Sequence, residues 1–249
     1  GYLWNGLVEH SNPNLNTGDT YGGNLEDIIW MVIYLPNEMN SDTNKAKAAI
    51  QNISIYPPMF KAAFGSEVVT FKNISRAIAQ FLRTLISANS RFDKYLRGEV
   101  NLTTQELNGY IIFNTEKGDC FHCHGTILFT TNNYFNNAKD SVFTDMYDRY
   151  SVTHDPHDIG FYKAPTLRNI ALTGPYMHDG RFVTLDEVIN FYSEGLVWSP
   201  YVSPLMKKVN DGGIQLTPSE KADLKAFLLT LSDSSFISNP VFSKPAGLP

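Results

Sequence analysis

The sequence predicts a mainly α-helical protein, and two kinds of observation indicate it. Apolar residues recur at helical spacing on one side of residues 73–89 and again near the C-terminus. Three segments begin with Thr-x-x-Glu, a pattern in which both side chains satisfy backbone N–H groups at a helix start. Strand signals are weak, and stretches rich in Pro, Asn and Gly at residues 11–24, 131–140 and 199–213 indicate loops.

The predicted helices follow one another along the chain. Residues 73–89 should form the first, because their apolar stripe can face a core. The stripe consists of Ile74, Ala77, Ile78, Phe81, Leu82 and Leu85. The pattern at Thr103 opens a second helix, and those at Thr184 and Thr217 open two more. Pro218 stands at the first position of the last helix, where proline is favoured. The apolar face of that helix consists of Leu224, Phe227, Leu228 and Leu231.

Composition sets broad limits on what the chain can be. Of its 249 residues, 43% are hydrophobic and 18% are charged, so it can bury one large core or two modest ones. The formal net charge of −5 is small, which argues against nucleic acid as a partner. The sequence has no run of about 20 apolar residues, so no membrane span is expected.

Residues 120–124, Cys-Phe-His-Cys-His, contain the C-x-x-C-H pattern through which c-type haem is attached. Two thiols one helical turn apart can bond covalently to the porphyrin edge, and the imidazole of His124 can coordinate the iron. A zinc site would need further Cys or His ligands, and a redox dithiol would need a βαβ context. Cys120 and Cys123 are the only cysteines. The sequence therefore predicts one covalent haem c, in the layout of a cytochrome c domain.

The sixth ligand of this iron is a separate question. Tyr192, Met177, Met206 and His178 all lie downstream of His124. From chemistry alone a thioether is favoured for an electron carrier, because Met ligation raises the haem potential. These residues by themselves leave the choice open.

Two neighbouring segments, residues 161–170 and 172–181, resemble the hallmark block of the bacterial dihaem cytochrome c peroxidase and MauG superfamily. They are FYKAPTLRNI and LTGPYMHDGR. Residues 2–6 (YLWNG) resemble the F-W-D-G motif of that family, and residues 37–40 (NEMN) resemble its N/V-E-M-N motif. Further similar segments lie at residues 60–65, 78–85 and 90–95. The likeness follows the expected order almost from end to end.

Members of this superfamily normally carry two C-x-x-C-H motifs, one in each cytochrome c-like domain, whereas this chain has one. We therefore expect the part that binds a first haem c to lie upstream of Gly1. On this interpretation residues 1–99 are the remainder of an N-terminal domain, and residues 100–249 form the C-terminal cytochrome c domain. A natural single-haem relative is the alternative.

The resemblance also bears on the sixth ligand. In classical peroxidases of the family a Met stands fourteen positions after the His of P-Y-x-H-D-G, and in the MauG-like branch a Tyr stands there. In this chain the position is Tyr192. The resemblance thus implies that His124 and Tyr192 ligate the haem iron, with Met206 and Met177 as the remaining candidates. Phenolate ligation stabilises ferric iron and implies a low potential.

The resemblance assigns roles to five other residues. Glu38 matches an acid above an open haem, where it can transfer protons during peroxide cleavage. Trp4 matches a tryptophan that relays electrons between the haems. The backbone carbonyls of Thr173 and Pro175 match two ligands of a calcium ion. Arg168 is expected to pair with a haem propionate.

The implied reaction is the reduction of hydrogen peroxide to water, with electrons arriving through the haem on His124. A small periplasmic cytochrome or cupredoxin is the expected donor, and a homodimer would fit the family. MauG-like oxidation of residues in a partner protein is one alternative, which Tyr192 favours, and a non-catalytic electron-transfer module is another. Covalent haem attachment generally takes place outside the cytoplasmic membrane, so a periplasmic location is expected.

Overall fold

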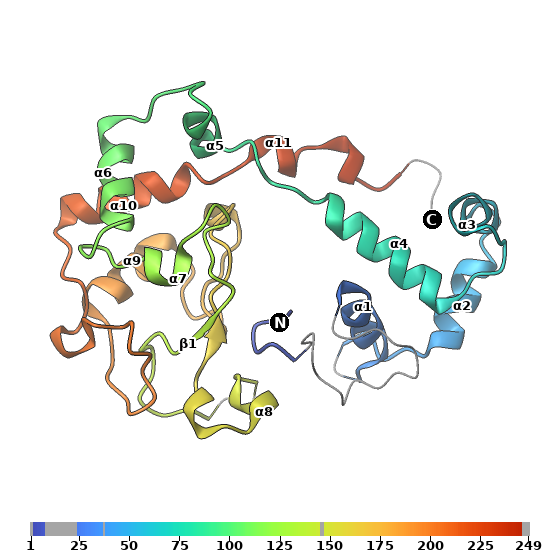
Figure 1. Ribbon diagram of the computed structural model, residues 1–249, viewed down its shortest axis with the longest axis horizontal. Coiled ribbons are helices and arrows are strands. Elements are labelled where there is room, and N and C mark those ends of the chain that lie inside the picture. The colour runs from blue at the N-terminus through green and yellow to red at the C-terminus, as the bar shows by residue number, and fades with distance from the viewer. Residues whose placement is uncertain (1, 8–23, 37, 145–146, 246–249) are drawn as a thin grey trace. The chain divides into compact units, whose positions relative to one another are not determined.

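The computed structural model describes residues 2–7, 24–36, 38–144 and 147–245, and helices dominate these ranges (Figure 1). Most of the loop predicted at residues 11–24 therefore lies outside the described residues. The chain divides into two compact units. The N-terminal unit comprises Tyr2 and the described residues from 24 to 86, and the C-terminal unit comprises residues 3–7 and 87–245. In the described ranges, no helix combines the length and the apolar character needed to cross a bilayer.

The N-terminal unit is built from helices that pack through small apolar clusters. They are α1 (Leu25–Tyr34), α2 (Thr43–Gln51), α3 (Tyr56–Phe64) and α4 (Phe71–Thr84). Asn24 begins α1, because its side chain accepts the N–H of Glu26 at 3.0 Å. Ile29 of α1 packs against Ala79 of α4. Arg83 of α4 forms an ion pair with Glu26 at 2.8 Å, so an apolar contact and an ion pair join α1 to α4.

The helix predicted over residues 73–89 has different limits in the structure. α4 begins after Thr70, whose hydroxyl accepts the N–H of Asn73 at 3.2 Å. Residues 85–89 leave the helix, and the N–H of Asn89 instead donates to the carboxylate of Asp233 at 2.9 Å. Ile74 is buried as the stripe predicts. Other members of the predicted stripe are exposed in the structure, namely Ile78, Phe81 and Leu82.

The C-terminal unit contains the remaining helices and the strands. The helices are α5 (Arg91–Leu96), α6 (Thr104–Phe113), α7 (Phe121–His124), α8 (Tyr150–Thr153), α9 (Leu185–Glu194), α10 (Pro218–Leu229) and α11 (Ser234–Ile237). Short 3-10 turns are η1 (Pro156–Asp158), η2 (Ile170–Leu172), η3 (Val209–Asp211) and η4 (Pro240–Phe242). The capping boxes predicted at Thr103, Thr184 and Thr217 are confirmed, since each Thr and its Glu bond to the other's backbone N–H.

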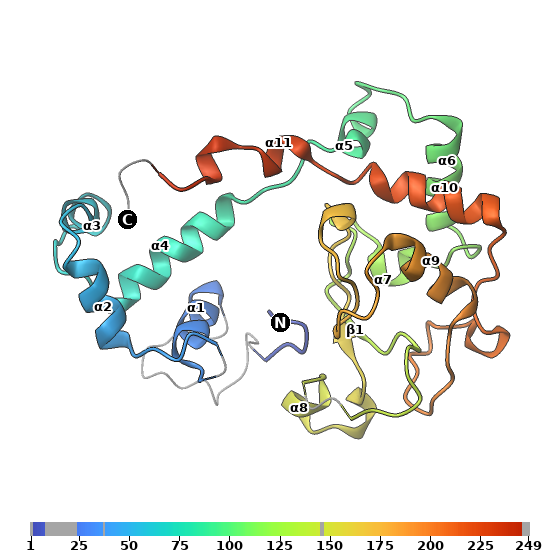
Figure 2. The ribbon, with the colours of Figure 1, turned by 180° about the vertical axis from the view of Figure 1, so that it is seen from behind.

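The core of the C-terminal unit forms where α6 crosses α10, which both views show (Figures 1 and 2). A Cβ at Gly109 of α6 would fall on the carbonyl oxygen of Asp223 of α10, so this close approach requires glycine. The crossing buries Phe113 and Phe227, whose ring centroids are 5.2 Å apart. The apolar face predicted for α10 is confirmed for Leu224, Phe227 and Leu228, which are buried, and Leu231 is buried just after the helix ends at Leu229.

A small antiparallel sheet joins β1 (Tyr134–Phe135) to β2 (Tyr162–Lys163), with Tyr134 opposite Lys163. Residues 3–7 attach to β2, because the N–H of Lys163 donates to the carbonyl of Trp4 at 2.7 Å. Gly6 has a φ of 74°, and a Cβ there would collide with the hydroxyl of Tyr134. Trp4 therefore belongs to the same compact unit as the cysteine motif.

The boundary between the units lies between Ile86 and Ser87, whereas the sequence patterns placed it near residue 99. Residues 87–99 pack with the C-terminal unit, because Phe92 lies in its core at 3% exposure. The N–H of Phe92 also donates to the carbonyl of Thr230 at 3.0 Å. These contacts join residues far apart in the chain, so local patterns could not show them.

Replacement of Phe227 by alanine should lower the free energy of unfolding by about 3–5 kcal/mol, because the ring is fully buried and its loss leaves a cavity. Leu229→Ala on the same helix is the matched control, since Leu229 is 48% exposed. We expect that control to cost less than about 1 kcal/mol. Urea unfolding followed by circular dichroism measures both, and equal losses would contradict the packing described.

Candidate haem site

The two cysteines are free thiols at the start and end of the first turn of α7. Burial raises the pKa of Cys120 to about 12 and that of Cys123 to about 11, so both are protonated at neutral pH. Cys120 Sγ donates to the carbonyl of Gly118 at 3.2 Å. Within the described chain, neither cysteine belongs to a group of three side chains that could hold a metal ion.

His124 presents one particular ring nitrogen for coordination. Its Nδ1 lies 3.1 Å from the carbonyl oxygen of Phe129 and 3.1 Å from that of Pro165. A carbonyl only accepts, so Nδ1 must carry the proton and Nε2 must keep its lone pair. Burial lowers the pKa of His124, and the two hydrogen bonds raise it by less. The imidazole is therefore neutral, in the tautomer that an iron ligand needs.

Two loops hold those carbonyls in place beside the cysteine motif. The N–H and hydroxyl of Thr131 both donate to the carbonyl of Cys123, at 3.0 and 3.1 Å. The hydroxyls of Thr130 and Thr166 then tie residues 128–130 to residues 164–166, through bonds of 2.5 Å to backbone carbonyls. The fold of these loops, rather than a neighbouring side chain, orients His124.

Three of the candidate sixth ligands lie together. Tyr192, Met177 and Met206 pack against one buried cluster. It consists of Ala138, Phe191 and Leu196. Burial raises the pKa of Tyr192 to about 12, a hydrogen bond from Asn137 lowers it, and the Cys123 and Cys120 thiols raise it further. At neutral pH Tyr192 is therefore a buried, protonated phenol.

The Asn137 side chain connects two of these candidates. Its Nδ2 lies 3.3 Å from the hydroxyl oxygen of Tyr192 and 3.5 Å from Met177 Sδ. His178 makes a different contact, since its ring stacks on Tyr162 with centroids 3.9 Å apart. Tyr192 remains the predicted ligand, and the geometry adds a polar partner for its oxygen.

Arg168 has a protein carboxylate as its partner. Its two terminal nitrogens donate to the two oxygens of Asp93 at 2.9 Å each, and one also donates to the carbonyl of Ile127 at 2.8 Å. The side chains are only 10% and 7% exposed. Burial raises the pKa of Asp93, but hydrogen bonds from Arg168 and Ser90 lower it by more, so the net shift is downward. This bidentate pair is the contact that the structure shows for Arg168, and its pairing with a haem propionate stays a prediction.

The remaining predicted residues lie on the surface of their units. Glu38 is exposed in a turn after α1, where its N–H donates to the carbonyl of Leu35 at 3.0 Å. Trp4 is 57% exposed. Thr173 and Pro175 are exposed in the segment that follows η2. The described contacts add no evidence for or against the roles predicted for these four.

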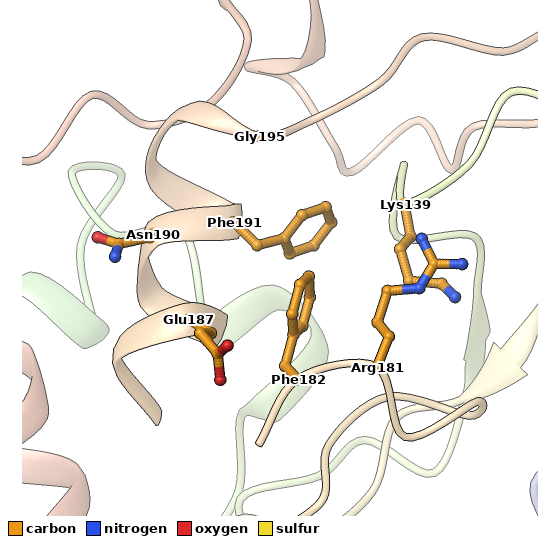
Figure 3. Close-up of a pocket in the computed structure, with 7 residues that line it drawn as sticks. All are labelled: Lys139, Arg181, Phe182, Glu187, Asn190, Phe191 and Gly195. Atoms are coloured by element: carbon orange, nitrogen blue, oxygen red, sulfur yellow. The ribbon is translucent and has the colours of Figure 1, made fainter. Parts of the chain in front are cut away.

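A pocket of about 530 Å³ opens beside α9. Figure 3 shows Phe182 and Phe191 between α9 and the side chains of Lys139 and Arg181. Lys139 is buried, with Nζ 2.6 Å from Asp179 and 3.1 Å from Asp140. Arg181 pairs with the same two carboxylates, at 2.7 and 2.8 Å. This network ties the segment that contains Asn137 to the segment that contains Met177.

The sequence patterns did not predict that Asn137 contacts candidate ligands. It falls in the predicted loop at residues 131–140, and nothing in the C-x-x-C-H motif points to it. The available signal was the concentration of amides in that loop, namely Asn132, Asn133, Asn136 and Asn137. Such residues also favour ordinary turns, so the signal is weak.

Comparisons with known proteins identify similar di-haem proteins. Residues 1–101 match the family model described as di-haem cytochrome c peroxidase. The chain is 36% identical to cytochrome c551 peroxidase of Nitrosomonas europaea, over 72% of this chain and 55% of the relative. It is 31% identical to the methylamine utilization protein MauG of Methylorubrum extorquens, over 86% of this chain and 59% of the relative. The chain thus spans little more than half the length of these relatives.

Solved structures with a similar fold include a MauG-like protein and a diheme peroxidase. The crystal structure of a MauG-like protein associated with microbial copper homeostasis matches with a TM-score of 0.83 and 34% identity, over 97% of this chain and 76% of the other. The diheme peroxidase BthA from Burkholderia thailandensis shares the fold, with a TM-score of 0.64, 22% identity, and coverage of 87% and 65%.

Asp93→Asn should lower the free energy of unfolding at neutral pH by about 3–5 kcal/mol, because it leaves the buried Arg168 without its anionic partner. The folded-state pKa of Asp93 lies below its unfolded value. Its contribution is therefore present above about pH 4 and is lost as the pH falls through the folded-state pKa. Urea unfolding at neutral and acidic pH should show the wild type approaching the variant on acidification.

Glu99→Gln is the control for this measurement. It removes the exposed pair that Glu99 forms with Arg97 at 2.6 Å, and solvent-exposed pairs contribute little. If Asp93→Asn had as small an effect as Glu99→Gln, the buried pair would not stabilise the C-terminal unit.

Proposed function

The chain belongs to the di-haem cytochrome c peroxidase and MauG family, and from that premise we propose that it supplies the electron-relaying, six-coordinate haem site of an enzyme that reduces hydrogen peroxide to water. The observation that carries this proposal is the tautomer of His124 beside two protonated thiols. A haem c held there supplies reversible one-electron chemistry. Reduction of one peroxide to two waters consumes two electrons and two protons, so a relay and a proton-transfer group are both needed.

The residues of this chain divide the work around that haem. Cys120 and Cys123 would hold it covalently, and His124 would bind its iron through Nε2. Tyr192 would offer a further ligand, an oxygen that already has a hydrogen-bond donor at 3.3 Å. Because a phenolate is a hard anionic donor, it favours ferric iron and keeps the potential of this haem low.

Trp4 is proposed as the aromatic relay. Its attachment to Lys163 at 2.7 Å supports the role, because it joins Trp4 to the strand that also carries Tyr162. The ring of Tyr162 in turn stacks on that of His178. The backbone of Trp4 thus lies beside the strand that carries Tyr162, in the unit that holds the cysteine motif.

Glu38 is proposed as the acid–base group for peroxide. A carboxylate at the surface of its unit can take a proton from hydrogen peroxide and return it to the leaving oxygen. The second haem c that this step requires is proposed from the family likeness, because this chain contains one C-x-x-C-H motif. Thr173 and Pro175 are proposed to offer backbone carbonyls to a calcium ion, which prefers oxygen ligands.

The expected setting completes the proposal. Covalent haem attachment supports a periplasmic location, and a small cytochrome or cupredoxin there would donate the electrons. A homodimer is part of the proposal by family likeness alone.

MauG-like oxidation of residues in a partner protein is the second candidate function. Two observations favour it, namely the tyrosine at position 192 and the 34% identity to a MauG-like protein over 97% of this chain. Peroxide is the oxidant in both proposals, so the electron source distinguishes them. A peroxidase draws electrons from a soluble donor, whereas the MauG-like reaction draws them from side chains of its partner.

Tyr192→Phe should remove the tyrosinate signal from the resonance Raman spectrum of the haem-loaded protein and raise the midpoint potential of that haem, because an anionic donor is lost. Tyr201→Phe is the control, since Tyr201 packs on Phe143 with ring centroids 5.7 Å apart. Pyridine haemochrome analysis counts covalent haem in each sample. An unchanged spectrum would point to Met206 or Met177, and absence of covalent haem would overturn the proposed function.

Glu38→Gln in the haem-loaded, full-length protein should slow peroxide-dependent oxidation of a reduced cytochrome by about 10²–10⁴-fold, because the amide cannot transfer the proton. Glu67→Gln is the control, as Glu67 is also an exposed glutamate of the N-terminal unit. Turnover of the Glu38 variant at the wild-type rate would remove this residue from the reaction.

A further inference from the structure

We propose that Asn137 is the positioning residue that fixes the Tyr192 oxygen as the sixth haem ligand and raises the potential of that haem by hydrogen bonding. The proposal rests on the proposed function, in which Tyr192 ligates the iron. Asn137 Nδ2 lies 3.3 Å from the Tyr192 oxygen and 3.5 Å from Met177 Sδ, so one nitrogen contacts both candidate ligands.

The orientation of the amide follows from its two neighbours. A thioether sulfur can only accept hydrogen bonds, so the NH₂ end of the amide must face Met177 Sδ, and the same nitrogen then donates to the Tyr192 oxygen. Its two hydrogens suffice for one bond to each atom. Asn137 thus holds Tyr192 and Met177 side by side, although only one of them can occupy the sixth position.

The backbone on both sides of Asn137 is fixed. The carbonyl of Asn136 accepts the N–H of Ser203 at 3.1 Å, and the carbonyl of Ala138 accepts the N–H of Val197 at 2.8 Å. The Asn136 side chain, 1% exposed, accepts the N–H of Ala138 at 3.1 Å. Ala138 itself has a φ of 59°, a conformation that costs free energy in an alanine. Asn137 therefore sits on a rigid support, as a positioning residue must.

The Met177 segment is held against the same support. Lys139 lies two residues after Asn137 and pairs with Asp179, two residues after Met177, at 2.6 Å. Figure 3 shows Lys139 next to Arg181, which also pairs with Asp179. Met177 has a φ of 70°, which side-chain-bearing residues adopt at a cost and mostly near functional sites. The pair between the buried Lys139 and the partly exposed Asp179 thus helps to hold Met177 at its distance from the amide.

Hydrogen bonding to the ligand changes the electronics of the iron. A coordinated phenolate keeps a lone pair free, and an N–H that donates to it stabilises the negative charge on the oxygen. The oxygen then donates less electron density to the iron, which makes the ferrous form easier to reach. Asn137 should therefore keep the potential of a tyrosine-ligated haem from falling as low as it otherwise would, so that a soluble donor can still reduce it.

The test uses the haem-loaded protein and three readouts: the midpoint potential, the tyrosinate vibrations and the covalent haem content. Asn137→Leu removes both donors at similar volume, and Asn137→Asp keeps the shape but replaces the NH₂ group with a carboxylate oxygen. Both should shift the midpoint potential to more negative values, with the larger shift for Asp because it adds a negative charge. Asn108→Leu is the control, since Asn108 is exposed on α6 and its side chain donates to Asp223 at 3.4 Å. It should leave the potential and the spectrum unchanged.

A double-mutant cycle with Tyr192→Phe separates positioning from a general structural effect. If Asn137 acts through the Tyr192 oxygen, Asn137→Leu should shift the potential in the wild type and produce no further shift in the Tyr192→Phe background. Equal shifts in both backgrounds, or wild-type potential and vibrations in both Asn137 variants, would overturn the proposal. If Tyr192→Phe itself left the spectrum unchanged, the ligand assignment in the proposed function would fail instead. Because the Asp variant is isosteric, a folding failure of the Leu variant would still leave a decisive measurement.

Discussion

The close crossing of α6 and α10 is the constraint on which the C-terminal unit depends. Because Gly109 has no side chain, the α6 backbone can lie against the carbonyl of Asp223, and the aromatic core closes around Phe113 and Phe227. α6 ends at Phe113, only a few residues before Cys120. Whatever fixes α6 therefore also fixes where the attachment site begins. The stability of the core and the position of the thiols have the same physical origin.

From that starting point the site is assembled mainly by backbone groups. The carbonyls that orient His124 come from loops, and the loops are held by threonine hydroxyls that bond to other carbonyls. Around Tyr192 the contacts are made by side chains, because the amide of Asn137 lies between a phenol and a thioether. The orientation of His124 can therefore persist while many nearby side chains vary. The electronic environment of the Tyr192 oxygen, in contrast, can change with a single substitution.

Local features of the structure could be predicted from the sequence, and features that depend on distant contacts could not. The capping boxes at Thr103, Thr184 and Thr217 need only four consecutive residues, and they were predicted correctly. On α6, Ile112 is buried whereas its neighbour Ile111 is 52% exposed, because the position of α10 selects the face. Tyr192 was found only through family likeness. The role of Asn137 depends on residues 40 and 55 positions further along the chain, which no local pattern could reveal.

The burial of the two thiols has a consequence for the chain before haem is attached. With a pKa of about 11, Cys123 is ionised in about one molecule in ten thousand at pH 7, and Cys120 even less often. Thiolates, not thiols, react with oxidants and disulfides. Burial therefore slows closure of the C-x-x-C pair into a disulfide, which would use up the thiols that bond to haem c. The fold thus keeps both thiols in the protonated form and preserves them for bonding to haem c.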